Sequence, residues 1–128
     1  MSGGPMDAAG DAGRARAAAR ERLLALRLNA IRRLHGLDAA FTDIVDAARD
    51  SNLDDEHDPE GSTIAAERSL VGSLATRGRE QLREIDEALA RLDIGRYGIC
   101  VSCGEPVGAG RLQARPAAAR CIRCARRA

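Results

Sequence analysis

The chain has 128 residues, a formal net charge of +1 and 2% aromatic residues, and these values exclude several classes of function. A chain of this length forms one domain or one elongated module with a modest core. Its near-neutral charge implies no attraction of the whole protein to polyanions. Phe41 and Tyr97 are its only aromatic residues. We therefore do not expect a base-stacking platform for single-stranded nucleic acid.

The first residues are small and rich in glycine, and we expect residues 1–13 to be a disordered tail. They contain no apolar run of the kind found in signal peptides, and no segment of the chain is apolar enough to span a bilayer. The sequence therefore predicts a soluble cytoplasmic protein, in which cysteines stay reduced.

Residues 14–94 carry the pattern of two long helices. From Arg14 to Arg49 there is no proline, and apolar residues recur every three or four positions, at Leu24, Leu28, Ile31, Leu34, Leu37, Phe41, Val45 and Ala48. A second stripe lies between Ser62 and Gly95, at Ile64, Val71, Leu74, Gly78, Leu82, Ile85, Leu89 and Leu92. Its spacing is that of a coiled coil, and Gly95 is expected to end the helix.

Two long helices joined by a short polar connection pack antiparallel. The predicted fold is therefore mainly α: a long antiparallel helical hairpin with its tip at about residues 51–61, and a small finger at its base over residues 95–128. Gly36 and Gly78 lie at similar heights in this hairpin, where they either allow close approach of the helices or a local bend, or are simply tolerated.

All four cysteines lie in two C-x-x-C pairs, C-V-S-C and C-I-R-C. Such pairs predict a tetrahedral zinc site with four sulfur ligands, Cys100, Cys103, Cys121 and Cys124. Disulfides or a thiol redox switch are the alternatives, but nothing in the chain indicates an oxidising compartment or a redox fold. Since four protein ligands leave no open position, we expect one structural Zn²⁺ and no catalysis.

Glycines indicate where the finger turns. Gly104 follows the second cysteine, where a positive φ is often needed, and Gly108 and Gly110 predict a turn around Ala109. Arg115-Pro116 is expected to be extended.

Charge is distributed unevenly along the chain. The predicted tip between Asp50 and Glu60 contains six acidic residues and no arginine, whereas the finger contains seven arginines and one acid, Glu105. The near-neutral net charge therefore conceals an acidic end and a basic end.

The hairpin, the acidic tip and the four-cysteine finger together resemble the TraR/DksA family of bacterial transcription factors, over about Leu24 to Ala125. The most specific matches are G-x-Y-G-x-C-x-x-C-G, which begins at Gly95, and R-L-x-A-x-P, which begins at Arg111. The resemblance implies a regulator that binds RNA polymerase without binding promoter DNA. It would insert the hairpin through the secondary channel to alter initiation.

The resemblance also implies roles for individual residues. Asp55 and Asp58 match the family's D-x-x-D tip signature, although Glu60 stands where the family has alanine. Arg111 and Arg115 are candidate docking residues, and Arg115 matches a phosphate-contacting arginine of the family. The positions of two alarmone-contacting lysines hold Glu84 and Ala125, so binding of guanosine tetraphosphate is not expected.

Two other classes of function remain open from the sequence. An arginine-rich finger could bind nucleic acid through its phosphates, without sequence specificity. The apolar stripes could instead oligomerise, as in a coiled-coil scaffold. An enzyme is not expected, because His35 and His57 are the only histidines and no nucleophile lies beside a base.

Overall fold

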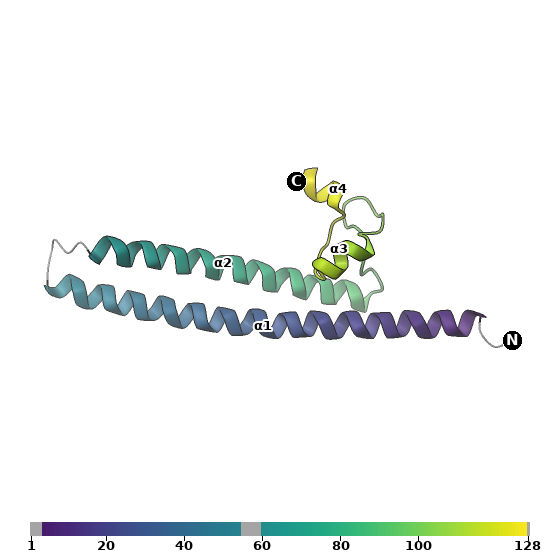
Figure 1. Cartoon of the computed structure of the whole chain (residues 1–128), viewed down its shortest axis with the longest axis horizontal. Helices are drawn as coiled ribbons and strands as arrows, with labels where there is room; N and C mark the ends of the chain where they lie inside the picture. The colour runs from purple at the N-terminus through teal and green to yellow at the C-terminus, as the bar shows by residue number, and fades with distance from the viewer. Residues whose placement is uncertain (1–3, 55–59, 128) are drawn as a thin grey trace. The chain divides into compact units, whose positions relative to one another are not determined.

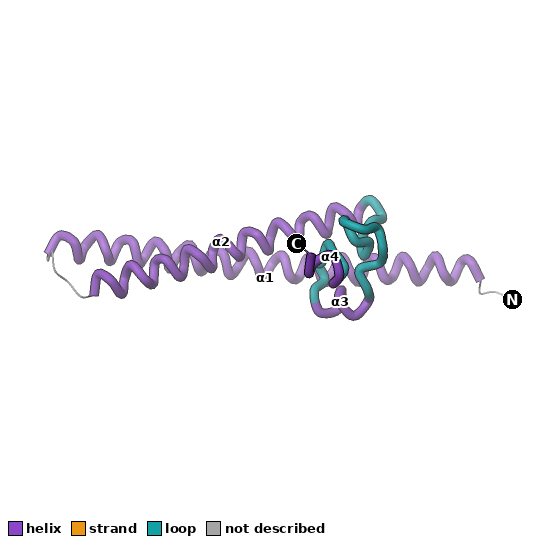
Figure 2. Tube along the Cα trace, turned by 90° about the horizontal axis from the view of Figure 1, so that it is seen from above, coloured by secondary structure: helices purple, strands orange, loops and turns teal. Residues whose placement is uncertain are grey.

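The computed structural model describes residues 4–54 and 60–127 (Figure 1). Its helices are α1 (Gly4–Asp54), α2 (Glu60–Asp93), α3 (Ala109–Ala114) and α4 (Ile122–Arg127). Over these described residues the β-type pairing consists of one isolated bridge, between Ile99 and Pro106. Loops are concentrated between α2 and α4 (Figure 2). The predicted mainly α fold is confirmed. No described helix is long and apolar enough to cross a bilayer.

The chain divides into two compact units. One unit is Asn29–Leu82, in which the second half of α1 pairs with most of α2. The other consists of Met1–Leu28 together with Arg83–Ala128, and it contains the finger.

In the Asn29–Leu82 unit the two helices run antiparallel. Arg33 donates a hydrogen bond of 3.1 Å to the Gln81 side chain, and Asp38 forms an ion pair of 3.7 Å with Arg79. As residue numbers rise on α1, their partners' numbers fall on α2. The buried residues between the helices are Ala30, Leu34 and Ala75.

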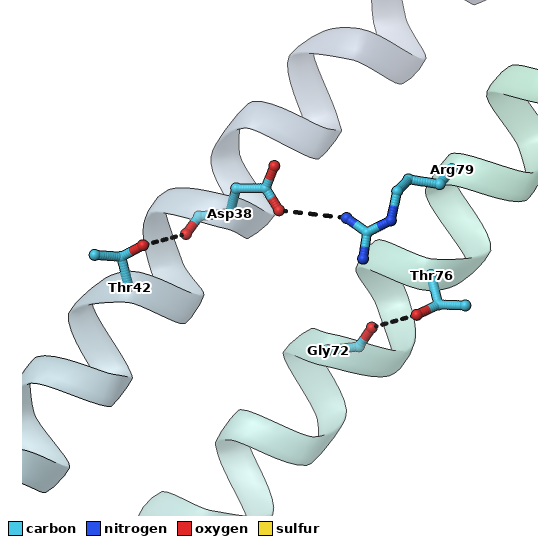
Figure 3. A network of polar contacts seen from close by, with 5 residues as sticks. All are labelled: Asp38, Thr42, Gly72, Thr76 and Arg79. Carbon is cyan, nitrogen blue, oxygen red and sulfur yellow. Dashed lines mark hydrogen bonds and ion pairs between the residues drawn. The ribbon is translucent and has the colours of Figure 1, made fainter.

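Polar side chains make contacts within and between these two helices (Figure 3). Thr42 and Thr76 each donate a hydrogen bond of 3.0 Å to the backbone carbonyl four residues earlier, at Asp38 and Gly72. Such bonds satisfy the hydroxyl groups within their own helix. Both side chains of the Asp38–Arg79 ion pair are exposed to solvent, so the pair contributes little to stability.

In the unit that contains the finger, the start of α1 pairs with the end of α2. The helices are joined by ion pairs of 2.7 Å from Arg20 to Asp93 and from Arg27 to Asp86. The buried side chains of these helices are Leu23, Ile85, Ala88 and Leu92. Antiparallel pairing of the predicted helices is therefore present in both units.

Helix α1 begins at Gly4, which differs from the disordered tail expected over residues 1–13. The segment is rich in alanine, the best helix former, and its only proline is Pro5 in the first turn, where the missing N–H is not needed. Asp11 also pairs with Arg14, one turn later. The glycines at positions 3, 4, 10 and 13, on which the predicted tail rests, do not prevent the helix from extending to Gly4.

The buried face of α1 also differs from the predicted stripe near the finger. Leu24 and Leu28 are 50% and 48% exposed, whereas Leu23 is fully buried. Leucines lie at positions 23, 24, 26 and 28 and cover much of the helix circumference, so spacing alone could not select the packed face.

The two helix glycines differ in their surroundings. A Cβ atom at Gly78 would lie 3.0 Å from Leu34 Cδ2, whereas one at Gly36 would meet nothing within 4 Å. Leu34 is buried, so its side chain has little room to move. Gly78 is therefore a site of close helix approach, and Gly36 is a tolerated glycine.

Replacing each glycine by alanine tests this difference. Gly36→Ala should raise the free energy of unfolding by about 0.5–1 kcal/mol, because alanine favours the helix and meets no neighbour. Gly78→Ala should raise the free energy of unfolding by less, or lower it, because the added Cβ atom crowds Leu34. Urea denaturation followed by far-UV circular dichroism measures both, and equal gains would contradict the close approach.

Candidate metal centre

The finger begins where α2 ends, at Asp93. Gly95 has a φ of +73°. Around it, the Gly95 N–H donates to the Leu92 carbonyl and the Arg96 N–H donates to the Arg91 carbonyl, at 3.2 and 2.8 Å. This is a Schellman motif, which needs a left-handed residue after the helix. The predicted helix end at Gly95 is confirmed, and the motif turns the chain into the first cysteine pair.

The first C-x-x-C pair lies on a short antiparallel turn. The Val107 N–H donates to the Gly98 carbonyl at 2.8 Å, and the Cys100 N–H donates to the Glu105 carbonyl at 2.7 Å. Gly104 has a φ of +76°, and its N–H donates to the Cys100 carbonyl at 2.9 Å. The positive φ expected at Gly104 is therefore present, and it folds the chain back directly after Cys103.

The second pair lies at the start of α4. Cys121 precedes the helix, and the Ala125 N–H donates to its carbonyl at 2.9 Å. Cys124 follows within the first turn, so both sulfurs lie on the same side of the helix. The Val101 N–H donates to the Ala119 carbonyl at 2.9 Å and joins the two pairs.

The four sulfur atoms lie within 4.8 Å of one another. The Sγ atoms of Cys103 and Cys121 are 3.8 Å apart. A tetrahedron with Zn–S bonds of about 2.3 Å has sulfur atoms about 3.8 Å apart, so the cluster fits Zn²⁺. All four cysteines are free in the described structure, so the disulfide alternative is not formed there.

Backbone N–H groups point at the sulfurs and favour thiolates. Burial would raise the pKa of Cys100, but N–H groups of Cys121, Cys103 and Ser102 outweigh it and lower this pKa to about 6. The N–H of Cys124 lowers the pKa of Cys121 against the effect of burial. Such N–H···S contacts stabilise the form that binds metal.

The other two thiols, of Cys103 and Cys124, have raised pKa values. The Cys121 side chain, followed by burial and the other sulfurs, raises the pKa of Cys124 to about 12. The Glu105 N–H lowers the pKa of Cys103, but the Cys100 side chain and burial outweigh it and the net direction is upward. Two thiols favour the ionised form and two resist it, as expected for a site built around a positive charge.

Three hydrogen bonds hold the segment between the two cysteine pairs in place. The Tyr97 hydroxyl donates to the Pro116 carbonyl at 2.7 Å, and Arg111 Nε donates to the Arg120 carbonyl at 2.7 Å. Arg120 Nε in turn donates to the Ser102 hydroxyl at 2.9 Å. Two of these bonds link the neighbourhood of the first cysteine pair to the segment that leads to the second pair, and the Arg111 bond links α3 to that same segment.

Helix α3 replaces the turn that Gly108 and Gly110 predicted around Ala109. Gly108 precedes it with a φ of +105°, which explains one of the two glycines. Arg22 of α1 donates to the carbonyls of Leu112 and Gln113 at 3.2 and 3.1 Å, near the end of α3. Sequence reasoning missed Arg22, because no local pattern indicates a contact 90 residues away.

The remaining predicted site residues are distributed as follows. Arg111 is half-buried and uses its Nε within the finger, whereas Arg115 is exposed at the end of α3. Asp55 and Asp58 lie outside the described residues. The structure therefore brings the four cysteines together and places Arg111 in the finger's own hydrogen-bond network.

The fold and the site define the class of protein: a helical hairpin that carries a four-cysteine finger. Residues 95–128 match the prokaryotic dksA/traR C4-type zinc finger. The structure resembles that of transcription factor DksA2 from Pseudomonas aeruginosa with a TM-score of 0.70 and 30% identity, covering 88% of this chain and 81% of that one.

Two relatives are named RNA polymerase-binding transcription factor DksA. The protein from Caulobacter vibrioides is 44% identical over 52 residues, which is 41% of this chain and 37% of that protein. The protein from Haemophilus influenzae is 44% identical over 63 residues, 49% of this chain and 43% of that protein. The matched segments thus span about two fifths of these relatives' length.

The chain belongs to the DksA/TraR family. Its finger is of the C4 zinc type, and the clustered sulfurs fit one structural Zn²⁺. When bound, the metal supplies the positive charge and the four-way cross-link that the thiols require, and it leaves no position open for a substrate.

The Tyr97–Pro116 hydrogen bond offers a test of how the finger is held. Burial raises the pKa of the Tyr97 hydroxyl, against smaller opposite effects of Arg22 and Arg91, so the group remains a donor. Tyr97→Phe should destabilise the finger by about 0.5–1.5 kcal/mol and accelerate zinc loss to a chromophoric chelator.

The matched control is Ile94→Ala, since Ile94 is 72% exposed just before the finger. It should lose zinc at the wild-type rate. If Tyr97→Phe also loses zinc at the wild-type rate, the Tyr97–Pro116 hydrogen bond does not hold the two cysteine pairs together.

Proposed function

We propose that this protein binds RNA polymerase directly and modulates transcription initiation by inserting the end of its helical hairpin into the secondary channel. The observation that carries the proposal is the match to transcription factor DksA2, which extends over 88% of this chain and includes hairpin and finger alike. The names of the Caulobacter and Haemophilus relatives supply the partner.

The structural features are suited to this role. Antiparallel helices with few buried residues present most of their side chains to the surroundings, which suits an element that makes contacts along its sides. The finger is joined to α1 by the hydrogen bonds of Arg22, and it is joined to the end of α2 by the Schellman turn at Gly95. In this proposal the zinc is structural and Arg115, exposed at the end of α3, contributes to docking.

Guanosine tetraphosphate is not part of the proposed activity of the free protein. Glu84 and Ala125 occupy the positions where the family has two contacting lysines, and Glu84 is exposed on α2. A carboxylate at that position repels a polyphosphate.

Direct binding is tested with purified components. The full-length, zinc-loaded protein should retain bacterial RNA polymerase core enzyme in a pull-down and should change run-off transcription from a responsive promoter. A protein that neither retains polymerase nor changes initiation at any of several promoters would contradict the proposal.

The proposed metal ligands are Cys100, Cys103, Cys121 and Cys124. Purified, reduced protein should contain one Zn²⁺ per chain, and Cys103→Ser should reduce this content and loosen the finger. Cys103 is exposed, so its replacement leaves the helix core intact and most of the far-UV circular dichroism should remain. Elemental analysis that finds no zinc in the wild-type protein would overturn the assignment.

The tip residues Asp55 and Asp58 are proposed to act near the polymerase active site rather than in docking. Asp55→Asn and Asp58→Asn together keep size and hydrogen-bonding shape but remove two negative charges. The free energy of unfolding should change by less than about 0.5 kcal/mol, as for most surface substitutions. Polymerase affinity should stay similar while the effect on initiation is lost.

Both measurements on the double variant are decisive. Regulation at the wild-type level would mean that the two carboxylates have no role. Loss of polymerase binding would mean that they determine affinity, and the proposed division between docking and effect would be wrong.

A further inference from the structure

The two compact units bury different sets of apolar side chains. Among the described residues of the Asn29–Leu82 unit, the buried ones are Ala30, Leu34 and Ala75, of which two are alanines. The finger unit, by which we mean Met1–Leu28 together with Arg83–Ala128, buries Leu23, Ile85, Ala88, Leu92, Cys100 and Val107. Burial of apolar surface is the main favourable term in folding, so the Asn29–Leu82 unit gains less from it.

Large apolar side chains of the Asn29–Leu82 unit remain in contact with solvent. Phe41, Leu70 and Leu74 are 37%, 61% and 40% exposed. On α1 none of the residues 35–50 is buried, and on α2 none of the residues 62–74 is. Over these described residues, the helix pair is therefore packed through half-buried side chains.

The polar contacts between the helices also differ. The Asn29–Leu82 unit has the hydrogen bond of 3.1 Å between Arg33 and Gln81 and the exposed ion pair of 3.7 Å between Asp38 and Arg79. The finger unit has two ion pairs of 2.7 Å, and Arg22 also joins α1 to the carbonyls of α3. The sulfur cluster adds a metal cross-link to the finger unit when zinc is bound.

Glycines weaken the helices of the Asn29–Leu82 unit, which contain Gly36, Gly72 and Gly78. Glycine is unfavourable inside a helix because it loses the most backbone freedom when it is ordered. Gly78 is needed for the close approach of Leu34, but Gly36 has no neighbour that requires it. The segments that pair in the finger unit, residues 20–28 and 83–93, contain no glycine.

We propose that the Asn29–Leu82 unit opens as one cooperative unit while the finger unit stays folded and keeps its zinc. In the open form the two helices of this unit separate and lose helical structure, because helices without a packed partner are marginal in water. Burial, polar contacts and glycine content all place the less stable part of the chain in this unit. The opening is a property of the free protein and goes beyond the proposed function.

Two other behaviours predict different results. Helices α1 and α2 each run through both units, so the whole chain could unfold in a single step. Alternatively, the hairpin could fray residue by residue from its tip, in which case Gly36 would still be helical when residues 40–50 open. A substitution at Gly36 would then leave the opening of residues 40–50 unchanged.

Hydrogen exchange followed by mass spectrometry tests the opening on full-length, zinc-loaded protein. The first variant is Gly36→Ala, which strengthens α1 within the Asn29–Leu82 unit. The matched control is Ala25→Gly, which makes the reverse exchange at an exposed position of the same helix in the finger unit. Amide exchange then reports the opening of each segment separately.

In the wild-type protein, amides of residues 29–54 and 60–82 should exchange at least about tenfold faster than those of residues 20–28 and 83–93. Gly36→Ala should slow exchange across residues 40–50 by about two- to fivefold, since it stabilises the closed form of the whole unit. Ala25→Gly should accelerate exchange of residues 20–28 and 83–93 by a similar factor and leave residues 29–54 and 60–82 unchanged. Zinc content should remain at one per chain in both variants.

The opening should also govern docking, a consequence that rests on the proposed function. Only the closed unit presents both helices in a fixed arrangement, so apparent affinity for polymerase falls with the closed fraction. Leu34→Ala removes the largest buried side chain of the unit. It should lower polymerase affinity by at least about twofold while the protein keeps one zinc per chain.

Other results overturn the proposal. Equal acceleration of all segments by Ala25→Gly would show that the chain unfolds in one step. Unchanged exchange of residues 40–50 in Gly36→Ala would show fraying from the tip. Full polymerase affinity of Leu34→Ala, together with accelerated exchange of the unit, would separate the opening from docking. A wild-type protein that does not bind polymerase would contradict the proposed function and leave the exchange results valid.

Discussion

The finger depends on four sulfur atoms held within 4.8 Å of one another. In the described finger, Cys100 and Val107 are the buried apolar residues, so hydrophobic burial contributes little to its stability. The pKa of Cys100 is lowered by backbone N–H groups, whereas that of Cys124 is raised by the neighbouring cysteine side chains, as expected where close thiols compete for ionisation. A divalent cation removes this conflict and closes the loop between the two pairs, so metal binding and folding of the finger are one equilibrium.

The sequence signature of the family follows from the same requirement. Gly95, Gly98 and Gly104 all have a positive φ, and a Cβ atom at Gly98 would lie 3.4 Å from Leu112. Other side chains are strained in that backbone region. Tyr97 bonds to Pro116, and Arg111 bonds to the carbonyl beside Cys121. These residues direct the chain so that the sulfurs converge, although the cysteines alone would hold the metal.

Much of the fold could be predicted because its determinants are local. Cysteine spacing, the period of the α2 stripe and Gly95 each act over a few residues, and the fold class, the sulfur cluster and the helix end were confirmed. The packed face of α1 was wrong at Leu24 and Leu28, since leucines surround the helix there and α2 selects Leu23. Arg22 could not be found, because its partners Leu112 and Gln113 are brought to it by the fold.

The outcome at the two glycines has the same explanation. Gly36 and Gly78 are equivalent in sequence terms, and only the position of Leu34 on the opposite helix makes one of them necessary. Helix α3 likewise formed where two glycines predicted a turn, because Gly108 alone provides the left-handed residue and the chain after it can become helical. Local sequence patterns identify the positions at which more than one backbone conformation is possible. Contacts with other elements determine which of these conformations forms.

The arginines of the described structure have several kinds of partner. Arg14, Arg20, Arg27 and Arg79 of the helices pair with aspartates on the neighbouring turn or helix, whereas Arg22 and Arg33 bond to backbone carbonyls or a side-chain amide. Finger arginines either hold the backbone, as Arg111 and Arg120 do, or project from it without a partner in the described structure. Apart from Arg111 and Arg120, the residues that build the finger are therefore distinct from those that give it charge. Since exposed arginines contribute little to the fold, substitutions at Arg96, Arg115, Arg123, Arg126 and Arg127 should alter the charge of the finger while the cysteines, glycines and Tyr97 keep its structure.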